Sequence, residues 1–142
     1  MSLINFQTTL LPVPRHAVFR MEEYQVWCST VVKISDGEYL MLYSRWPQEL
    51  GYDAWVTHSE VCYATASDPL GPFTFQSVAL QGSGGVCWDT DVIHNPTLLE
   101  VDGKYYLYYT GNRGNGEYWT HRNNQRIGVA VADHPCGSLD NI

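Results

Sequence analysis

The sequence is short of charged residues, and above all of basic ones. Asp, Glu, Lys and Arg together make up 16% of its 142 residues, against about 25% in an average globular protein. There are 8 Lys and Arg against 15 Asp and Glu, so the formal net charge is −7. Because nucleic acids and anionic membranes are bound through clustered Lys and Arg, we expect neither as a partner.

A long apolar run is also lacking. The longest apolar stretch is far below the ~18 residues that a membrane span needs. Residues 1–16 have neither the basic start nor the apolar centre of a signal peptide. We therefore expect a soluble protein and leave its compartment open.

The four cysteines are few and far apart. Cys28, Cys62, Cys87 and Cys136 form no Cys-x-x-Cys pair and no short Cys–His spacing of the kind that zinc needs. We expect no metal and no cofactor. Three of the four lie in or beside apolar, strand-like runs, where a free cysteine usually behaves as a small buried hydrophobic residue. Burial is therefore predicted for these cysteines.

An internal repeat is the most informative feature that is present. Residues 30–44 (TVVKISDGEYLMLYS) match residues 96–110 (PTLLEVDGKYYLYYT) at an offset of 66, and residues 61–71 match residues 127–137 at the same offset. The two Asp-Gly pairs coincide in this alignment. A search for such repeats comes first because a missed repeat leads to the wrong fold.

Each repeat reads as antiparallel β-sheet. Asp-Gly between runs rich in Val, Ile, Leu and Tyr is a strong hairpin signal, because a type I′ turn needs two residues that tolerate positive φ. Proline ends the third strand, since it cannot continue an interior ladder. The expected strands are 26–34, 38–46, 59–66 and 73–80, then 92–101, 104–110 and 125–132.

A four-stranded unit that recurs in this way is typical of a β-propeller. We predict an all-β fold with two antiparallel propeller blades, at 25–80 and 88–142, and no helix longer than two turns. The second blade is truncated in its fourth strand, and residues 1–24 form an N-terminal extension that is a candidate ring-closing strand. Two blades cannot close a ring, so missing blades or self-association must cover the open edges and the apolar face.

Residues 88–96 (WDTDVIHNP) place two Asp, one His and one Asn at the start of the second blade. The first strand of a propeller blade lines the central channel, which would place Asp89, Asp91, His94 and Asn95 near the axis. On a regular strand Asp89, Asp91 and Asn95 share one face and His94 the other, although Asn95-Pro96 disturbs such regularity. The alternative is an Asp-rich turn that satisfies its own backbone.

Two long loops, 47–58 and 112–124, occupy equivalent positions in the two repeats. Such loops often carry function. Aromatic rings suit the C–H faces of sugars, while carboxylate, amide and imidazole groups suit their hydroxyls. The alternative is that these aromatic residues only pack the loops on the blades. The residues concerned, on these loops and the strands after them, are Asp53, Trp55, His58, Glu60, Trp119, His121, Asn124 and Arg126.

The ordered set of short motifs resembles the glycoside hydrolase family 43-like proteins of the five-bladed propeller clan that family 43 shares with family 32. The motifs are RMEEYQVWC at 20–28, YSRWP at 43–47, HSEV at 58–61, WD at 88–89, HNP at 94–96, DGKYYLYYTGN at 102–112 and RIGVA at 126–130. The resemblance covers residues 11–142.

The resemblance implies a glycosidase whose acids come from successive blades around the channel mouth. One carboxyl group protonates the leaving oxygen while another activates water or attacks the anomeric carbon. Asp89 matches the second-blade acid best, whereas the first-blade position reads Trp27-Cys28-Ser29 and has no carboxylate. The candidate catalytic residues are Asp89, Asp91 and Glu60. The candidate sugar-binding residues are Trp27, Arg45, Trp46, His58, His94, Asn95, Trp119 and Arg126.

Three functions stay open at this point. The first is part of a glycoside hydrolase that cleaves an oligo- or polysaccharide, and the second is a non-catalytic carbohydrate-binding propeller module. A glycan phosphorylase would need a cluster of basic residues to hold phosphate. Arg45, Arg113, Arg122 and Arg126 make no obvious cluster.

Overall fold

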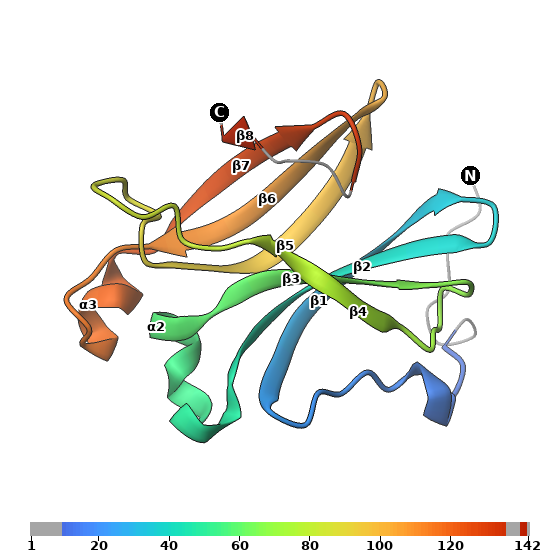
Figure 1. Cartoon of the computed structure of the whole chain (residues 1–142), viewed down its shortest axis with the longest axis horizontal. Helices are drawn as coiled ribbons and strands as arrows, with labels where there is room; N and C mark the ends of the chain where they lie inside the picture. The colour runs from blue at the N-terminus through green and yellow to red at the C-terminus, as the bar shows by residue number, and fades with distance from the viewer. Residues whose placement is uncertain (1–9, 136–139, 142) are drawn as a thin grey trace.

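The computed structural model describes residues 10–135 and 140–141, which form two antiparallel four-stranded sheets (Figure 1). The strand orders are β1-β2-β3-β4 and β5-β6-β7-β8, so within each sheet every strand pairs with its neighbours in sequence. The first sheet comprises β1 (Tyr24–Ser35), β2 (Glu38–Pro47), β3 (Glu60–Ala66) and β4 (Thr74–Leu80). The second comprises β5 (Val92–Val101), β6 (Lys104–Asn112), β7 (Arg126–Ala132) and β8 (Asp140–Asn141). The all-β propeller-type fold is confirmed, with each expected strand within about two residues of its predicted bounds.

Helices are confined to short pieces. These are η1 (Arg15–Ala17), η2 (Gln48–Leu50), η3 (Tyr52–Ala54), α2 (Trp55–His58) and α3 (Tyr118–Asn123). In the part of the chain that the structure describes, no helix has the length and apolar character to cross a bilayer. Figure 1 shows α2 and α3 near each other at one end of the sheets, where they occupy the two long loops.

The two hairpins differ by one bulge. In the β5–β6 hairpin Asp102 and Gly103 both have positive φ, 52° and 76°, as a type I′ turn requires. In the β1–β2 hairpin only Gly37 does, and the register shifts between Lys33 and Ser35. A bulge inserts one extra residue in one strand. The offset of 66 therefore holds from Ser35 onward. The part of β1 before the bulge matches β5 at an offset of 67 instead.

This shift changes which residues of β1 and β5 are equivalent. Trp27 pairs with Ser44 and His94 pairs with Thr110, in each case immediately before a bulge, which is one of two in β1 and the single register shift between β5 and β6. Within these bulges Cys28 and Asn95 have positive φ, 46° and 55°. Trp27 and His94 are thus structural counterparts, as are Cys28 and Asn95, which the gapless sequence alignment does not indicate.

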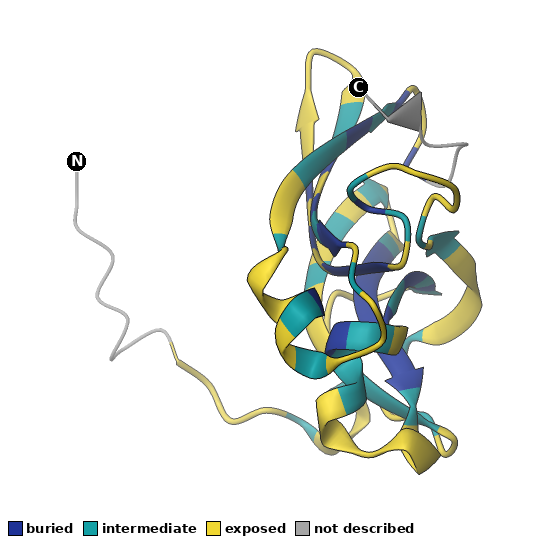
Figure 2. Ribbon diagram, turned by 90° about the vertical axis from the view of Figure 1, so that its left-hand side faces the viewer, coloured by how far each residue is buried: buried dark blue, intermediate teal, exposed yellow. Residues whose placement is uncertain are grey.

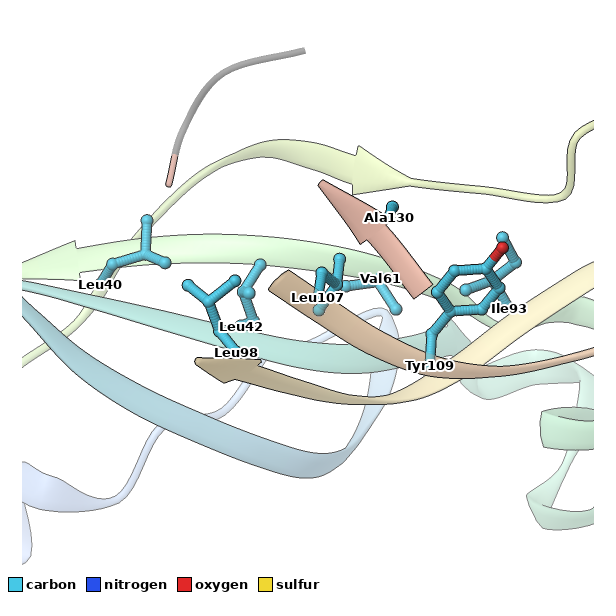
Figure 3. Close-up of a cluster of buried hydrophobic side chains, with 8 residues drawn as sticks. All are labelled: Leu40, Leu42, Val61, Ile93, Leu98, Leu107, Tyr109 and Ala130. Atoms are coloured by element: carbon cyan, nitrogen blue, oxygen red, sulfur yellow. The ribbon is translucent and has the colours of Figure 1, made fainter. Parts of the chain in front are cut away.

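The core lies between the two sheets. Leu40, Leu42 and Val61 from the first sheet pack against residues of the second, as Figure 3 shows. Buried residues accordingly lie along the strands where the sheets meet (Figure 2). The contributions of the second sheet are Ile93, Leu98, Leu107, Tyr109 and Ala130. Burying these side chains at roughly 25 cal/mol per Å² is the main force that holds the sheets together.

In the described part of the chain, no buried cluster covers the outer face of the second sheet. At the offset of 66, Leu42 and Val61 correspond to Tyr108 and Ile127, which are 42% and 79% exposed. Leu99 and Val101 are each 50% exposed as well. The face of the first sheet that holds Leu42 and Val61 packs against the second sheet. The equivalent face of the second sheet, which holds Tyr108 and Ile127, points outward.

The outer face of the first sheet is covered by its own chain. Met41, Tyr43, Cys62 and Ala64 form a buried cluster there. The side chains that pack against it are Phe19, Met21, Val26 and Phe73. The division into an extension at 1–24 and blades at 25–80 and 88–142 stays a prediction.

Candidate functional site

One pocket of about 260 Å³ lies beside the short helices of the two long loops. It is lined by residues from both sheets and both loops, so neither repeat could form it alone. The first sheet and its loop supply Trp27, Ser44, Trp46, Tyr52, Asp53, Trp55 and Ser59. The second supplies His94, Asn95, Tyr118 and Arg122.

Aromatic rings form two groups in this lining. On the side of the first sheet, the ring of Tyr52 meets those of Trp27 and Trp46 edge-on, with centroids 5.9 and 6.2 Å apart. In the second group, Trp55 meets His94 at 5.2 Å and Tyr118 at 6.2 Å, again edge-on. Such edge-to-face pairs hold each other in place, so the apolar walls of the pocket are preformed.

Polar groups also line the pocket. The Asn95 N–H donates to the Ser44 hydroxyl over 2.8 Å, which ties the bulge of β5 to β2. The Ser59 hydroxyl donates to the carbonyl of Trp55. Asp53 and Arg122 bring one negative and one positive charge to the pocket from exposed positions.

His94 is the most deeply buried of the titratable pocket residues. Its side chain is 2% exposed, and neither ring nitrogen has a hydrogen-bond partner among the described residues. Burial lowers the pKa of His94, and the adjacent Asn95 side chain, which does not reach hydrogen-bonding geometry with either ring nitrogen, offsets part of this shift. The imidazole is therefore neutral at pH 7.

A buried network holds the two loops together behind the pocket. The side-chain amide of Asn112 donates to the Val56 carbonyl over 3.1 Å, and its oxygen is 2.7 Å from Nδ1 of His121. His121 Nε2 accepts from the Gly116 N–H at 3.0 Å. Asn112 thus joins α2 of one loop to α3 of the other.

Four of the predicted site residues line the pocket. They are Trp27, Trp46, His94 and Asn95. The other seven do not belong to its lining: Asp89, Asp91, Glu60, Arg45, His58, Trp119 and Arg126. Their roles in binding or catalysis stay predictions. In the structure Asp89, Asp91, Arg45 and Glu60 each contact other protein groups.

Asp89 precedes β5 and has two hydrogen-bond partners. It is 4% exposed, and its two carboxylate oxygens accept from the hydroxyls of Ser83 and Tyr109, each at 2.8 Å. Trp88 stacks on the Tyr109 ring at 6.0 Å. These contacts fasten the connection between the sheets onto β6.

Asp91 also lies before β5 and accepts from the Gly114 N–H at 2.9 Å. Because β5 begins only at Val92, the alternation of faces expected on a regular strand does not extend to Asp89 or Asp91. The bulge at Asn95 further breaks the alternation.

Arg45 and Glu60 form an ion pair on the first sheet. The guanidinium lies 2.8 Å from the Glu60 carboxylate and over the rings of Tyr24 and Phe75, at 4.1 and 4.6 Å from their centroids. His58 is exposed and its Nδ1 is 2.8 Å from the Thr57 hydroxyl. Trp119 is 66% exposed and contacts the ring of Tyr118.

Several lining residues are not among the site residues predicted from the sequence. Asp53 and Trp55 were noticed on their loop, but Ser44, Tyr52, Ser59, Tyr118 and Arg122 were not singled out as ligands. Tyr52 and Tyr118 lie in the two equivalent loops, so that loop equivalence was a usable signal. Ser44 and Ser59 carry no comparable signal, because a serine within or beside a strand is common.

The prediction of buried cysteines holds only for Cys62. Cys28 and Cys87 are exposed, while Cys136 lies outside the described residues. Cys28 lies at the positive-φ position of the β1 bulge, and Cys87 in the connection between the sheets, so neither follows the inward side of a strand. Within the described ranges, no three His, Cys, Asp or Glu side chains are grouped to hold a metal ion.

Solved structures share this arrangement of strands. A family 117 glycoside hydrolase from the marine bacterium Zobellia galactanivorans superposes with a TM-score of 0.64 and 21% identity, over 84% of this chain and 38% of that protein. The family 43 enzyme of Xanthomonas citri, complexed with xylotriose, gives a TM-score of 0.59 and 18% identity, over 87% and 33%. The chain has the fold of part of a propeller glycoside hydrolase.

Sequence comparison agrees with the likeness to family 43. A xylosidase/arabinosidase from Bacteroides ovatus is 41% identical over 49 residues, which are 34% of this chain and 13% of that protein. The chain thus matches about one eighth of the length of that relative and about a third of the propeller hydrolases of known structure. No family model matches the sequence.

Proposed function

We propose that the pocket binds a sugar residue and that the chain forms part of a glycoside hydrolase acting on oligo- or polysaccharides. The observation that carries this proposal is the composition of the pocket: five aromatic side chains line it together with a few hydrogen-bonding groups. Aromatic faces suit the C–H surfaces of a sugar, and polar groups among them suit its hydroxyls. The likeness to a xylosidase/arabinosidase and to an enzyme that binds xylotriose makes xylotriose the first ligand to test.

Hydrolysis needs more than the described lining supplies. Asp53 is the one carboxylate among the lining residues that the structure describes, whereas glycosidases of the usual kind use two carboxyl groups on either side of the scissile bond. A second carboxylate must therefore reach the sugar from outside this lining. Asp89, Asp91 and Glu60 stay the candidates predicted from the sequence, and each would first have to exchange its present contacts for the ligand.

A non-catalytic carbohydrate-binding module is the second candidate function. The single lining carboxylate favours it, because one group cannot act as acid and base at once. The two functions predict the same binding by this chain and differ in turnover. We expect this chain alone to bind sugar with little or no hydrolysis.

The bare outer face of the second sheet needs a partner. Tyr108, Ile127 and Leu99 would be covered either by further blades or by a second copy of the chain. In a head-to-tail arrangement, this face of one copy would meet the outer face of the first sheet of another. Phe19, Met21 and Phe73 already cover that outer face, so two copies would pair through their second sheets instead.

A matched pair of tyrosines tests the pocket. Tyr52 is 56% exposed and lines the pocket, whereas Tyr108 is 42% exposed and lies on the bare face of the second sheet. We expect Tyr52→Ala to weaken xylotriose binding by roughly 3- to 10-fold, the scale of one lost aromatic contact, and Tyr108→Ala to leave it unchanged. Calorimetric titration measures both affinities, and equal affinities in the two variants would contradict the proposed pocket.

A further inference from the structure

Among the described residues three buried side-chain nitrogens have no hydrogen-bond partner: Nε2 of Gln125, which does not line the pocket, and the two ring nitrogens of His94. Both are buried and without a hydrogen-bond partner in the described structure, although the residue lines the pocket. Buried polar atoms are nearly always hydrogen-bonded, so each exception calls for an explanation. The edge-on contact with Trp55 at 5.2 Å fixes one side of the ring, and a ligand in the pocket is the available source of partners.

The protonation state of His94 decides which ligand groups fit it. A neutral imidazole has one N–H donor and one nitrogen acceptor. A sugar hydroxyl can both donate and accept, so hydroxyl groups can satisfy either nitrogen. An imidazolium has two donors and no acceptor, and it would carry a charge into a site where burial opposes charge.

We propose that neutral His94 binds ligand hydroxyl groups through both ring nitrogens, so that protonation of His94 releases the sugar from the pocket. This inference rests on the proposed function, because it assigns a residue and a pH response to the same sugar pocket. It concerns a binding role and requires no chemical step.

Other titratable groups near the pocket must be separated from His94. Asp53 and Tyr52 from η3, with Tyr118 and Arg122 from α3, share the lining. Further titratable or charged groups stand near lining residues in the sequence but do not line the pocket themselves. They are Cys28 on β1, Arg45 on β2, His58 on α2, Glu60 on β3, Asp91 just before β5 and His121 on α3. Asp53 is the acid that shares the pocket with His94, so it needs its own control.

The sign of the pH effect follows from the lowered pKa of His94. Above that pKa the imidazole is neutral and the affinity for sugar is constant. Below it the affinity falls by up to tenfold for each pH unit, because the bound state requires the unprotonated ring. The decline therefore begins below the ordinary histidine value of about 6.5.

The test measures xylotriose affinity of the whole chain by calorimetric titration between pH 4.5 and 7.5. His94→Gln keeps donor and acceptor groups but does not titrate, so we expect it to bind more weakly than the unmodified chain at pH 7.5 and to show no further decline in acid. His94→Phe removes both nitrogens and should bind at least tenfold more weakly at pH 7.5. Asp53→Asn should keep the decline, and circular dichroism at each pH checks that every variant is folded.

A second measurement requires no variant. Nitrogen-15 NMR follows the titration of the His94 ring, whose midpoint should move to lower pH when xylotriose is bound. An unmoved midpoint, an acid decline that persists in His94→Gln, or full affinity in His94→Phe would overturn the role of His94 while leaving a sugar pocket in place. Absence of xylotriose binding by the unmodified chain at every pH would instead contradict the proposed function and this inference with it.

Discussion

At the residue scale, buried polar side chains divide into those that hold the fold and those that face the pocket. Asp89 belongs to the first group by its contacts, because hydroxyls of Ser83 and Tyr109 occupy both of its oxygens. His94 belongs to the second, since its nitrogens have no partner in the described structure. The burial of the two residues is similar, at 4% and 2% exposed. Their different hydrogen bonding, and not their burial, indicates their different roles.

Removing the Tyr109 hydroxyl tests the structural role of Asp89. Tyr109→Phe leaves the buried carboxylate with one partner fewer, and an unsatisfied buried acceptor costs about 1–3 kcal/mol. We expect the free energy of unfolding in urea to fall by this amount. Tyr108→Phe, at the exposed neighbouring position, should change it by less than about 0.5 kcal/mol. A Tyr109→Phe chain as stable as the original would mean that Asp89 does not depend on this bond.

At the scale of elements, the pocket depends on two very short helices that could not form alone. Isolated helices below about 12 residues are marginal in water, and α2 and α3 have 4 and 6 residues. Asn112 and His121 supply the missing stability by linking the loops. Gly114 is part of this arrangement, because a Cβ there would lie 2.4 Å from the His121 ring.

Gly114→Ala should therefore displace His121 and loosen α3. We expect a loss of about 1–3 kcal/mol in the free energy of unfolding, the cost of a steric clash and a lost buried hydrogen bond. The same change in a His121→Ala background should cost much less, because the ring it would meet is absent. Urea unfolding of the four chains forms a double-mutant cycle. Equal costs in both backgrounds would show that Gly114 acts independently of His121.

At the scale of the whole molecule, the repeat creates two similar sheets in different surroundings. The face that joins the first sheet to the second recurs, uncovered, on the outside of the second. A contiguous apolar face with unpaired strand edges favours association. The covering of the first sheet by Phe19 and Met21 limits how far such association can extend.

We expect the chain to associate in solution through the bare face of its second sheet. Ile127→Lys places a charge on that face and should shift the sedimentation profile toward the monomer. Val18→Lys adds the same charge at another exposed apolar position, 51% exposed, and should not. A chain that is monomeric at high concentration, with or without these changes, would exclude this mode of association.

The sequence by itself determined the strands, the hairpins and the two-sheet organisation. These depend on local rules, since alternating apolar residues around Asp-Gly allow few other structures, and the repeat supplied each prediction twice. His94 and Asn95 were predicted because the first strand of a propeller blade lines the channel, and Trp27 and Trp46 because they stand in motifs that resemble family 43.

Only the tertiary structure decided which side chains meet. The bulge in β1 made Trp27 the counterpart of His94, and a shift of one residue changes the direction of every side chain before it. Packing of one sheet on the other brought Ser44 to Asn95 and Tyr118 to Trp55, across separations in sequence that no local pattern encodes. The same packing left the His94 nitrogens without partners, because hydrogen bonding depends on atomic positions that periodicity does not specify.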